Sequence, residues 1–257
     1  MEAHRRDVSH GRPFVRLNVA ESVDGKLAPV NSGKVNFGSD DDRSEMENFR
    51  AEADGVIIGG GTLVAEDPPL IIRNAEVIAR RLAAKGSRHP KNICVCGSLP
   101  PNLTEMRFFT NTETEKLVFT TSRTPSNLIE LARRYAQVEL IPLNASGRVD
   151  LVEVVRSLPA YGVNTLLLEG GGELNFSMLE AGFVDEVCIT LAPFIFGGRS
   201  APTSFDGVGL TFENVRKLSL KSYRVTPQGE VFLRYDVLTE APTITPSRLF
   251  SNGVQIS

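Results

Sequence analysis

The chain contains no tryptophan and only three cysteines and three histidines among its 257 residues. Three cysteines are too few for the disulfide framework that stabilises many small secreted domains. The cysteines, at 94, 96 and 188, and the histidines, at 4, 10 and 89, do not have the usual spacing of zinc ligands, so no metal site is expected. We interpret the cysteines as buried free thiols of a protein that works in the reducing cytoplasm.

The sequence also lacks a long apolar run and a large excess of either charge. No apolar stretch approaches the roughly 18 residues that a membrane-spanning helix needs. The polar segment 1–12 lacks the apolar core of a secretory signal. A net charge of −3 argues against a surface for nucleic acid or anionic lipid. With 41% hydrophobic and 23% charged residues, the composition is that of a globular domain with a substantial core.

Short apolar runs alternate with helical patterns over the first two thirds of the chain. Strands are predicted at 14–20, 56–58, 93–96, 117–120, 138–141 and 165–168. Helices are predicted to begin after Ser39, at Thr124-Pro125 with Leu128, Leu131 and Tyr135 on one face, after Asp150, and after Gly172. This alternation is typical of an α/β domain with a mostly parallel central sheet flanked by helices.

The alternation of predicted strands and helices ends after Gly182. Residues 184–191, 218–225 and 230–237 read as strands, and the last two form a hairpin, so the sheet should end in antiparallel strands. We find no repeat or linker. The predicted organisation is a flexible N-terminal tail over 1–12, one domain over 13–238 and a C-terminal tail over 239–257.

Two glycine-rich turns, Gly59–Thr62 and Glu169–Gly172, each follow an apolar strand. Glycines allow close backbone approach to a ligand, and the helix that follows would present free N–H groups to an anion. The second turn therefore predicts a pyrophosphate cradle with Glu169 at its edge, although a tight strand-to-helix connection would need the same glycines. Because ligands bind at the carboxyl ends of parallel strands, both turns could line one cleft.

Charged residues elsewhere suggest further site and structural roles. Asp24 and Lys26 lie in a turn at the end of the first strand, where we expect them to contact a ligand. Ser39 and the acids at 40–42 form a helix start, and we interpret these acids as solvated first-turn charge rather than a metal site. Asn36-Phe37-Gly38 could reach over a ligand.

Together the motifs resemble the riboflavin-pathway reductases of the dihydrofolate-reductase-like fold. The matching stretches are Ser22–Lys26, Arg50, Gly59–Thr62 with Asp67-Pro68, Gly97-Ser98, Leu168–Gly172 and Ala192–Gly198. The resemblance covers residues 14–238. It implies a homodimer with an eight- or nine-stranded sheet. It also implies NADPH-dependent reduction of a ribosylamino-pyrimidinone 5′-phosphate to its ribitylamino product.

The resemblance also implies roles for individual residues. Those expected to contact NADPH are Ala20, Thr62, Glu66, Ser98, Gly170, Gly171, Gly172 and Glu173. Those expected around the substrate are Asn18, Lys26, Arg50, Leu70, Arg73 and Glu169, to which the turn argument adds Asp24. Arg50 and Arg73 would bind the 5′-phosphate, because guanidinium groups suit it. Lys26 and Glu169 would be the catalytic, proton-handling pair at the opened ribose.

The chain departs from the family pattern in two places. It has Glu66-Asp67-Pro68 where the family usually has Asp-Asp-Pro, and it has no tryptophan near Asn36 or Phe37. It carries neither the His-x-Glu nor the Pro-Cys-x-x-Cys signature of a zinc deaminase, so a stand-alone reductase is expected.

Two other functions are compatible with parts of the pattern. One is a same-fold reductase of a pterin, a dihydrofolate or another aldehyde or imine, and the other is a nucleotide-binding module without turnover. The joint presence of Lys26, Arg50, Arg73 and Glu169 favours the pyrimidine reductase.

Overall fold

A computed structural model describes residues 11–30 and 38–238. The predicted C-terminal tail, most of the predicted N-terminal tail, and Asn36 and Phe37 lie outside these residues. Arg12 belongs to the folded domain, since its guanidinium pairs with the Asp185 carboxylate at 2.8 Å.

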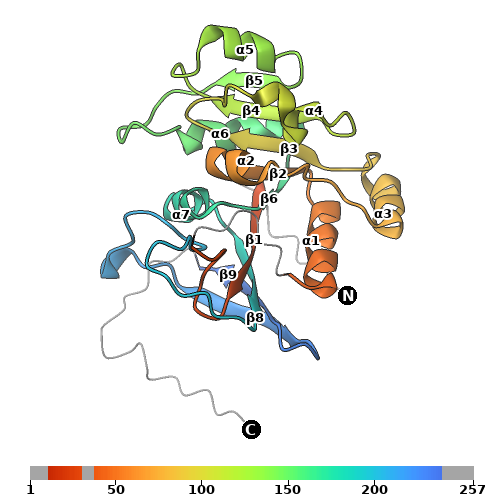
Figure 1. Cartoon of the computed structure of the whole chain (residues 1–257), viewed down its shortest axis with the longest axis vertical. Coiled ribbons are helices and arrows are strands. Elements are labelled where there is room, and N and C mark those ends of the chain that lie inside the picture. The colour runs from red at the N-terminus through yellow and green to blue at the C-terminus, as the bar shows by residue number, and fades with distance from the viewer. Residues whose placement is uncertain (1–10, 31–37, 239–257) are drawn as a thin grey trace.

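The described residues form one nine-stranded sheet (Figure 1). The strands are β1 (Phe14–Ser22), β2 (Gly55–Gly59), β3 (Lys91–Val95), β4 (Lys116–Thr120), β5 (Gln137–Leu140), β6 (Thr165–Leu168), β7 (Glu186–Ala192), β8 (Leu218–Val225) and β9 (Val231–Val237). They are arranged in the order β5-β4-β3-β2-β6-β1-β7-β9-β8. All pairs from β5 to β7 are parallel, and β9 joins β7 and β8 antiparallel. The predicted α/β class and its antiparallel ending are confirmed.

Helices cover both faces of this sheet. They are α1 (Asp40–Glu52), α2 (Gly60–Glu66), α3 (Ala75–Lys85), α4 (Arg107–Thr110), α5 (Ser126–Ala132), α6 (Leu151–Ser157) and α7 (Gly172–Glu180). Side chains of α1, α2, α4 and α5 pack in one apolar cluster, and those of α6 and α7 pack in a second one. Successive strand residues alternate between the two clusters, as the pleat requires: Val56 and Ile58 face the first, and Ile57 the second.

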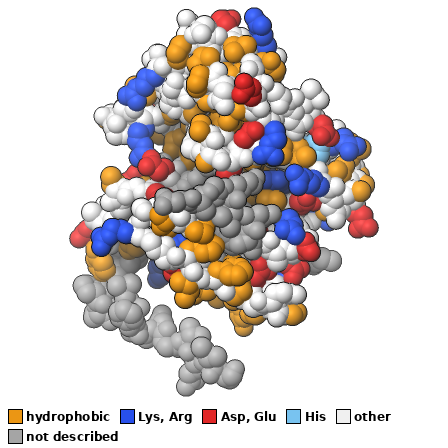
Figure 2. All heavy atoms as spheres, viewed as in Figure 1, with side chains coloured by type: hydrophobic (Ala, Val, Ile, Leu, Met, Phe, Trp, Pro, Cys, Tyr) orange, Lys and Arg blue, Asp and Glu red, His pale blue; other side chains and the backbone are white. Residues whose placement is uncertain are grey.

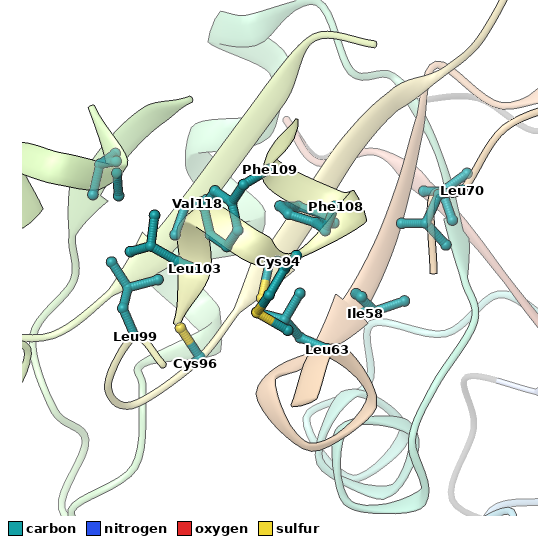
Figure 3. Close-up of a cluster of buried hydrophobic side chains, with 14 of the residues drawn as sticks. Ile58, Leu63, Leu70, Cys94, Cys96, Leu99, Leu103, Phe108, Phe109 and Val118 are labelled. Carbon is teal, nitrogen blue, oxygen red and sulfur yellow. The ribbon is translucent and has the colours of Figure 1, made fainter. Parts of the chain in front are cut away.

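The first cluster contains two of the three cysteines. Figure 3 shows Cys94 and Cys96 among Leu63, Leu103 and the two phenylalanines of α4. The rings of Phe108 and Phe109 meet edge to face, with their centroids 5.1 Å apart. All three cysteines are buried and unpaired, as predicted.

Side-chain caps explain where several helices begin. Ser39 accepts a hydrogen bond from the Asp42 amide, and Asp150 accepts one from the Val152 amide, so both predicted starts are confirmed. Helix α3 was not predicted, although Asn74 caps its start and Gly86, at a φ of 71°, ends it. It is mostly solvent-exposed, and Val77 and Arg81 are its buried residues.

Helix α5 differs in detail from its prediction. Its buried residues are Ile129 and Ala132, whereas Leu128 and Leu131 are only partly buried. Tyr135 lies beyond the end of the helix and is exposed. The buried face of α5 is therefore shifted by one residue from the predicted face.

The surface shown in Figure 2 carries interspersed basic and acidic side chains, with no continuous patch of one sign. The edge strand β8 is exposed along its whole length and includes Leu220, Tyr223 and Val225. Within the described ranges, no helix has the length and apolar character needed to cross a bilayer.

Candidate active site

A cleft of about 1350 Å³ opens at the carboxyl edge of the parallel strands. Its wall includes Asn18 and Ala20 on β1, one face of α1, and both glycine turns. The prediction that the two turns line a single cleft is confirmed. They do so because β2 and β6 are neighbours in the sheet, although many residues separate them in the chain.

Backbone hydrogen bonds join the two glycine turns. The Gly59 amide donates to the Gly170 carbonyl at 2.8 Å, and the Glu169 amide donates to the Ile57 carbonyl at 3.1 Å. Gly170 has a φ of 96°, which L side chains rarely adopt. The two turns are therefore joined side by side in the wall of the cleft.

Close packing explains the glycines at 171 and 172. A Cβ at 171 would lie 3.1 Å from the Thr62 hydroxyl, inside the cleft. A Cβ at 172 would lie 2.3 Å from the Thr203 carbonyl oxygen, which no real side chain tolerates. Gly172 is thus needed by the fold, whereas Gly171 keeps the surface beside Thr62 open.

Arg50 and Glu169 form a two-pronged ion pair in the cleft wall. Nε of Arg50 lies 2.7 Å from one carboxylate oxygen of Glu169, and Nη2 lies 2.6 Å from the other. Nη1 donates to the Ile71 carbonyl at 2.8 Å. Burial opposes the charge of Arg50, but the adjacent Glu169 carboxylate outweighs it and raises the guanidinium pKa.

Most of the predicted site residues lie in the wall of this one cleft. They are Asn18, Ala20, Arg50, Thr62, Glu66, Leu70, Arg73, Ser98, Glu169, Gly170, Gly171, Gly172 and Glu173. Leu70 is buried and has a φ of 47°, an uncommon backbone conformation for a residue with a side chain. The carboxylate of Glu173 already pairs with Arg148 at 2.7 Å.

Asp24 is a correction, because the structure does not bring it to the cleft. Its carboxylate accepts hydrogen bonds from the Ser22 hydroxyl at 2.6 Å and from the amides of Phe196 and Gly197. These donors, the Ser22 hydroxyl first, lower the pKa of Asp24 to about 2. Asp24 therefore holds two loops together.

Lys26 is also outside the cleft wall, whereas the next residues, Leu27 and Ala28, line it. Its backbone closes the turn, with the Ser22 amide donating to the Lys26 carbonyl at 2.9 Å. In the structure the Glu169 carboxylate pairs with Arg50. The joint catalytic role of Lys26 and Glu169 at the opened ribose stays a prediction.

Glu66 and Asp67, the departure from the family pattern, have separate positions. Glu66 lines the cleft. Asp67 has a φ of 43°, and its carboxylate accepts the amides of Arg107 and Phe108 at 2.7 and 3.0 Å, which caps α4.

Several charged residues of the cleft were not predicted as site residues. They are Asp42, Arg43 and Glu47 on α1, and Arg123, Arg148 and Asp150 near β4 and α6. The spacing of Asp42, Met46 and Arg50 places them on one helical face, and this signal could have identified Asp42. Arg123 follows the carboxyl end of β4, the kind of position where ligands bind.

The comparisons with known proteins agree with this geometry. Residues 13–232 match the family described as RibD C-terminal domain. A protein of Archaeoglobus fulgidus named 2,5-diamino-6-ribosylamino-4(3H)-pyrimidinone 5′-phosphate reductase is 31% identical over 196 residues, which cover 76% of this chain and 87% of that protein. A protein of the same name from Methanothermobacter thermautotrophicus is 33% identical over 201 residues, with coverages of 77% and 86%.

The chain belongs to the RibD C-terminal domain family. Its fold resembles that of a pyrimidine reductase-like protein from Corynebacterium diphtheriae, with a TM-score of 0.74 at 21% identity over 89% of this chain and 93% of that one. RibD of Acinetobacter baumannii has a TM-score of 0.71 at 25% identity, over 90% of this chain and 59% of that one. The predicted family is confirmed.

Proposed function

We propose that this RibD-family chain is an NADPH-dependent reductase. Its substrate would be a 6-ribosylamino-pyrimidinone 5′-phosphate, and its product the ribitylamino compound, in riboflavin biosynthesis. The observation that carries the proposal is the Arg50–Glu169 pair, which lies beside the open glycine turns in one cleft. The names of the two archaeal relatives support this substrate class over a pterin or a non-catalytic module.

The glycine turns fit the pyrophosphate of a dinucleotide. The bare backbone at Gly171 faces the Thr62 hydroxyl, which makes no hydrogen bond to another described residue. The first turn of α7 follows directly, so its N–H groups favour an anion. We assign the cofactor contacts to Ala20, Thr62, Glu66, Ser98 and the turn from Gly170 to Glu173.

Arg123 supports NADPH rather than NADH. Its exposed side chain lines the cleft beyond Ser98 and forms no ion pair within the described part of the chain. A guanidinium without an acidic partner is suited to the 2′-phosphate that distinguishes the two cofactors. The Thr121 hydroxyl donates to the Gly97 carbonyl at 2.6 Å and holds the turn of Arg123 against the turn of Ser98.

The substrate end of the cleft combines Asn18, Leu70 and two arginines. Arg73 is exposed, and its guanidinium has no partner among the described residues, so we assign it to the 5′-phosphate. The Arg50 guanidinium has five N–H donors, of which three are engaged, and the remaining two can add to phosphate binding.

We assign Glu169 to a position beside C1′, the carbon that accepts the hydride. A bound nicotinamide supplies the hydride. Opening of the ribosylamine leaves a C1′=N iminium, and hydride addition at C1′ turns it into the secondary amine. The Glu169 carboxylate, fixed by Arg50, would stabilise the positive charge of the iminium and accept hydrogen bonds from the ribose hydroxyls.

The direct test is reduction by the purified protein. NADPH or NADH is mixed with the 2-amino substrate, with its deaminated form, or with dihydrofolate, and loss of the reduced nicotinamide absorbance is followed. We expect turnover with a phosphorylated pyrimidinone and NADPH. Oxidation of NADPH with dihydrofolate alone, or with no substrate, would contradict the proposal.

We also propose a cytoplasmic homodimer. Buried free thiols support the compartment. The exposed edge strand β8, which carries Leu220, Tyr223 and Val225, supports association, because an unpaired strand edge can pair with a second chain.

A further inference from the structure

Asp42 differs from its two acidic neighbours at the start of α1. Asp40 and Asp41 are exposed, as first-turn acids usually are. Asp42 is only partly exposed and lines the cleft with Asn18 and Ala20. No role in the fold or in the reaction described above accounts for this carboxylate.

The packing of α1 on the sheet fixes the direction of Asp42. Ser39 donates to the Glu230 carboxylate, and Arg234 donates to the Glu45 carboxylate, so the first turns of α1 are held against β9. This packing brings the Asp42 carboxylate near the side chain of Thr190 on β7. Thr190 is buried and in register with Ala20 of β1, a residue that lines the cleft.

Asp42 has no cationic partner. No ion pair within residues 11–30 and 38–238 includes it, and the nearest arginine, Arg43, is paired with Asp40. Glu45 and Glu230 are close and carry like charge, and burial, followed by these acids, raises the pKa of Asp42 even though Thr190 and Arg43 lower it. A carboxylate in this setting is stabilised by N–H donors from a ligand.

Asp42, Met46 and Arg50 form a row along the face of α1 that lines the cleft. Arg50 lies eight positions after Asp42 in the helix, a rise of about 12 Å. Arg73 lines the same end of the cleft as Arg50, which we call the arginine end. The side-chain amide of Asn18 has no hydrogen-bond partner among the described residues. This length accommodates a phosphate at the arginine end, a pentose chain, and a ring at Asp42.

Building on the proposed function, we infer that Asp42 binds the N3–H and 2-amino edge of the pyrimidinone and selects the 2,5-diamino substrate over its deaminated form. These two ring groups are adjacent donors, and a carboxylate accepts from both at once. In the deaminated ring the 2-amino group is a carbonyl, whose oxygen would face the carboxylate. The carboxylate oxygen and the C2 carbonyl oxygen are both acceptors and repel each other, which weakens binding of the deaminated substrate.

The test is the ratio of kcat/KM for the two substrates in wild type, in Asp42→Asn and in Asp41→Asn. Asparagine has nearly the same shape, but its amide offers one acceptor and one donor, which complement the N3–H and 2-carbonyl of the deaminated ring. We expect wild type to favour the diamino substrate by at least about tenfold. Asp42→Asn should abolish or invert this preference, losing activity on the diamino substrate and gaining on the deaminated one.

Asp41→Asn is the matched control, because it removes the same charge from the same helix turn at an exposed position. Its substrate ratio should equal that of wild type. An equal loss on both substrates in Asp42→Asn, or an unchanged ratio, would overturn the inference and assign Asp42 to α1 packing alone. If wild type reduces neither substrate, the proposed function itself fails. Melting temperatures of the three proteins confirm that folded enzymes are compared.

Discussion

The guanidinium of Arg50 holds both carboxylate oxygens of Glu169, a residue 119 positions further along the chain. The pair links helix α1 to the glycine turn after β6, and both side chains are about 10% exposed. Under the proposed function, we expect Arg50 to act on the reaction through the orientation of Glu169, in addition to any contact with phosphate.

Arg50→Lys should mainly lower kcat. Lysine keeps the charge but cannot reach both carboxylate oxygens, so Glu169 loses its fixed orientation. We expect kcat to fall at least about tenfold, or about 1.4 kcal/mol of transition-state stabilisation. Arg73→Lys is the matched comparison and should mainly raise KM, with a small effect on a dephosphorylated substrate. Steady-state kinetics of both variants that show only a KM effect for Arg50→Lys would make Arg50 a phosphate ligand alone.

Gly171→Val should abolish NADPH binding while the protein still folds. The Cβ of the new side chain would lie 3.1 Å from the Thr62 hydroxyl oxygen. The side chain would fill this space and prevent the backbone from approaching the pyrophosphate. Gly172→Ala should instead destabilise the fold, because its Cβ would overlap the Thr203 carbonyl. Calorimetric NADPH titration and thermal melts separate the two effects. Normal NADPH affinity in folded Gly171→Val would rule out the cradle.

Glu66→Ala should lower the affinity for NADPH, whereas Asp67→Ala should lower the stability of the fold. Glu66 lines the cleft, so its loss should weaken NADPH binding, whereas Glu66→Asp should retain activity within about tenfold. Asp67 caps α4, so Asp67→Ala should cost about 1 kcal/mol of unfolding free energy and leave NADPH affinity unchanged. Loss of affinity confined to Asp67→Ala would mean that the two roles are exchanged.

The contribution of Asp24 to stability should depend on pH in the acid range. Its pKa is lowered from 3.8 to about 2 in the folded protein, so the folded state binds the proton less readily than the unfolded chain. The stabilisation is complete above about pH 4 and is lost as the pH falls toward 2. Asp24→Asn should therefore lower the melting temperature at pH 7, and the difference from wild type should shrink between pH 4 and 2. A constant difference across this range would contradict the assigned hydrogen bonds.

Acidic residues on the exposed edge strand should prevent association. Replacement of Leu220 and Tyr223 by aspartate places two negative charges on β8, where side chains are exposed in the single chain. Light scattering during size-exclusion chromatography should show a dimer for wild type and a monomer for the double variant. A wild-type monomer, or a dimer that survives the double change, would exclude this edge as the interface.

The elements of the fold were largely readable from local patterns, because buried strands are short apolar runs and capped helices carry their signals in one turn. The exposed helix α3 was missed for a tertiary reason. Its buried Arg81 donates to the carbonyls of Arg50, Ala51 and Ala53 at the end of α1, which no local periodicity encodes.

The site was predictable to the extent that family motifs mark it. The glycine turns and Arg50 line one cleft, as the sequence predicted, whereas the ion pair between Arg50 and Glu169 was not predicted. Asp24 and Asp42 show why: both are acids near a strand or helix end. The amides of Phe196 and Gly197, far along the chain, bind Asp24 to a loop, whereas Asp42 lies near Thr190 of β7 and lines the cleft.

The sheet order has a consequence for synthesis of the protein. Strand β1 pairs only with β6 and β7 among the described strands, and both leave the ribosome after β2 to β5. At a synthesis rate of about 5–20 residues per second, β1 has no neighbouring strand to pair with for on the order of ten seconds. During that interval Val15, Leu17 and Val19, which are buried in the finished fold, remain open to chaperones and to aggregation. We therefore expect the cleft to assemble only after β6, which lies between β1 and β2 in the sheet, has been synthesised.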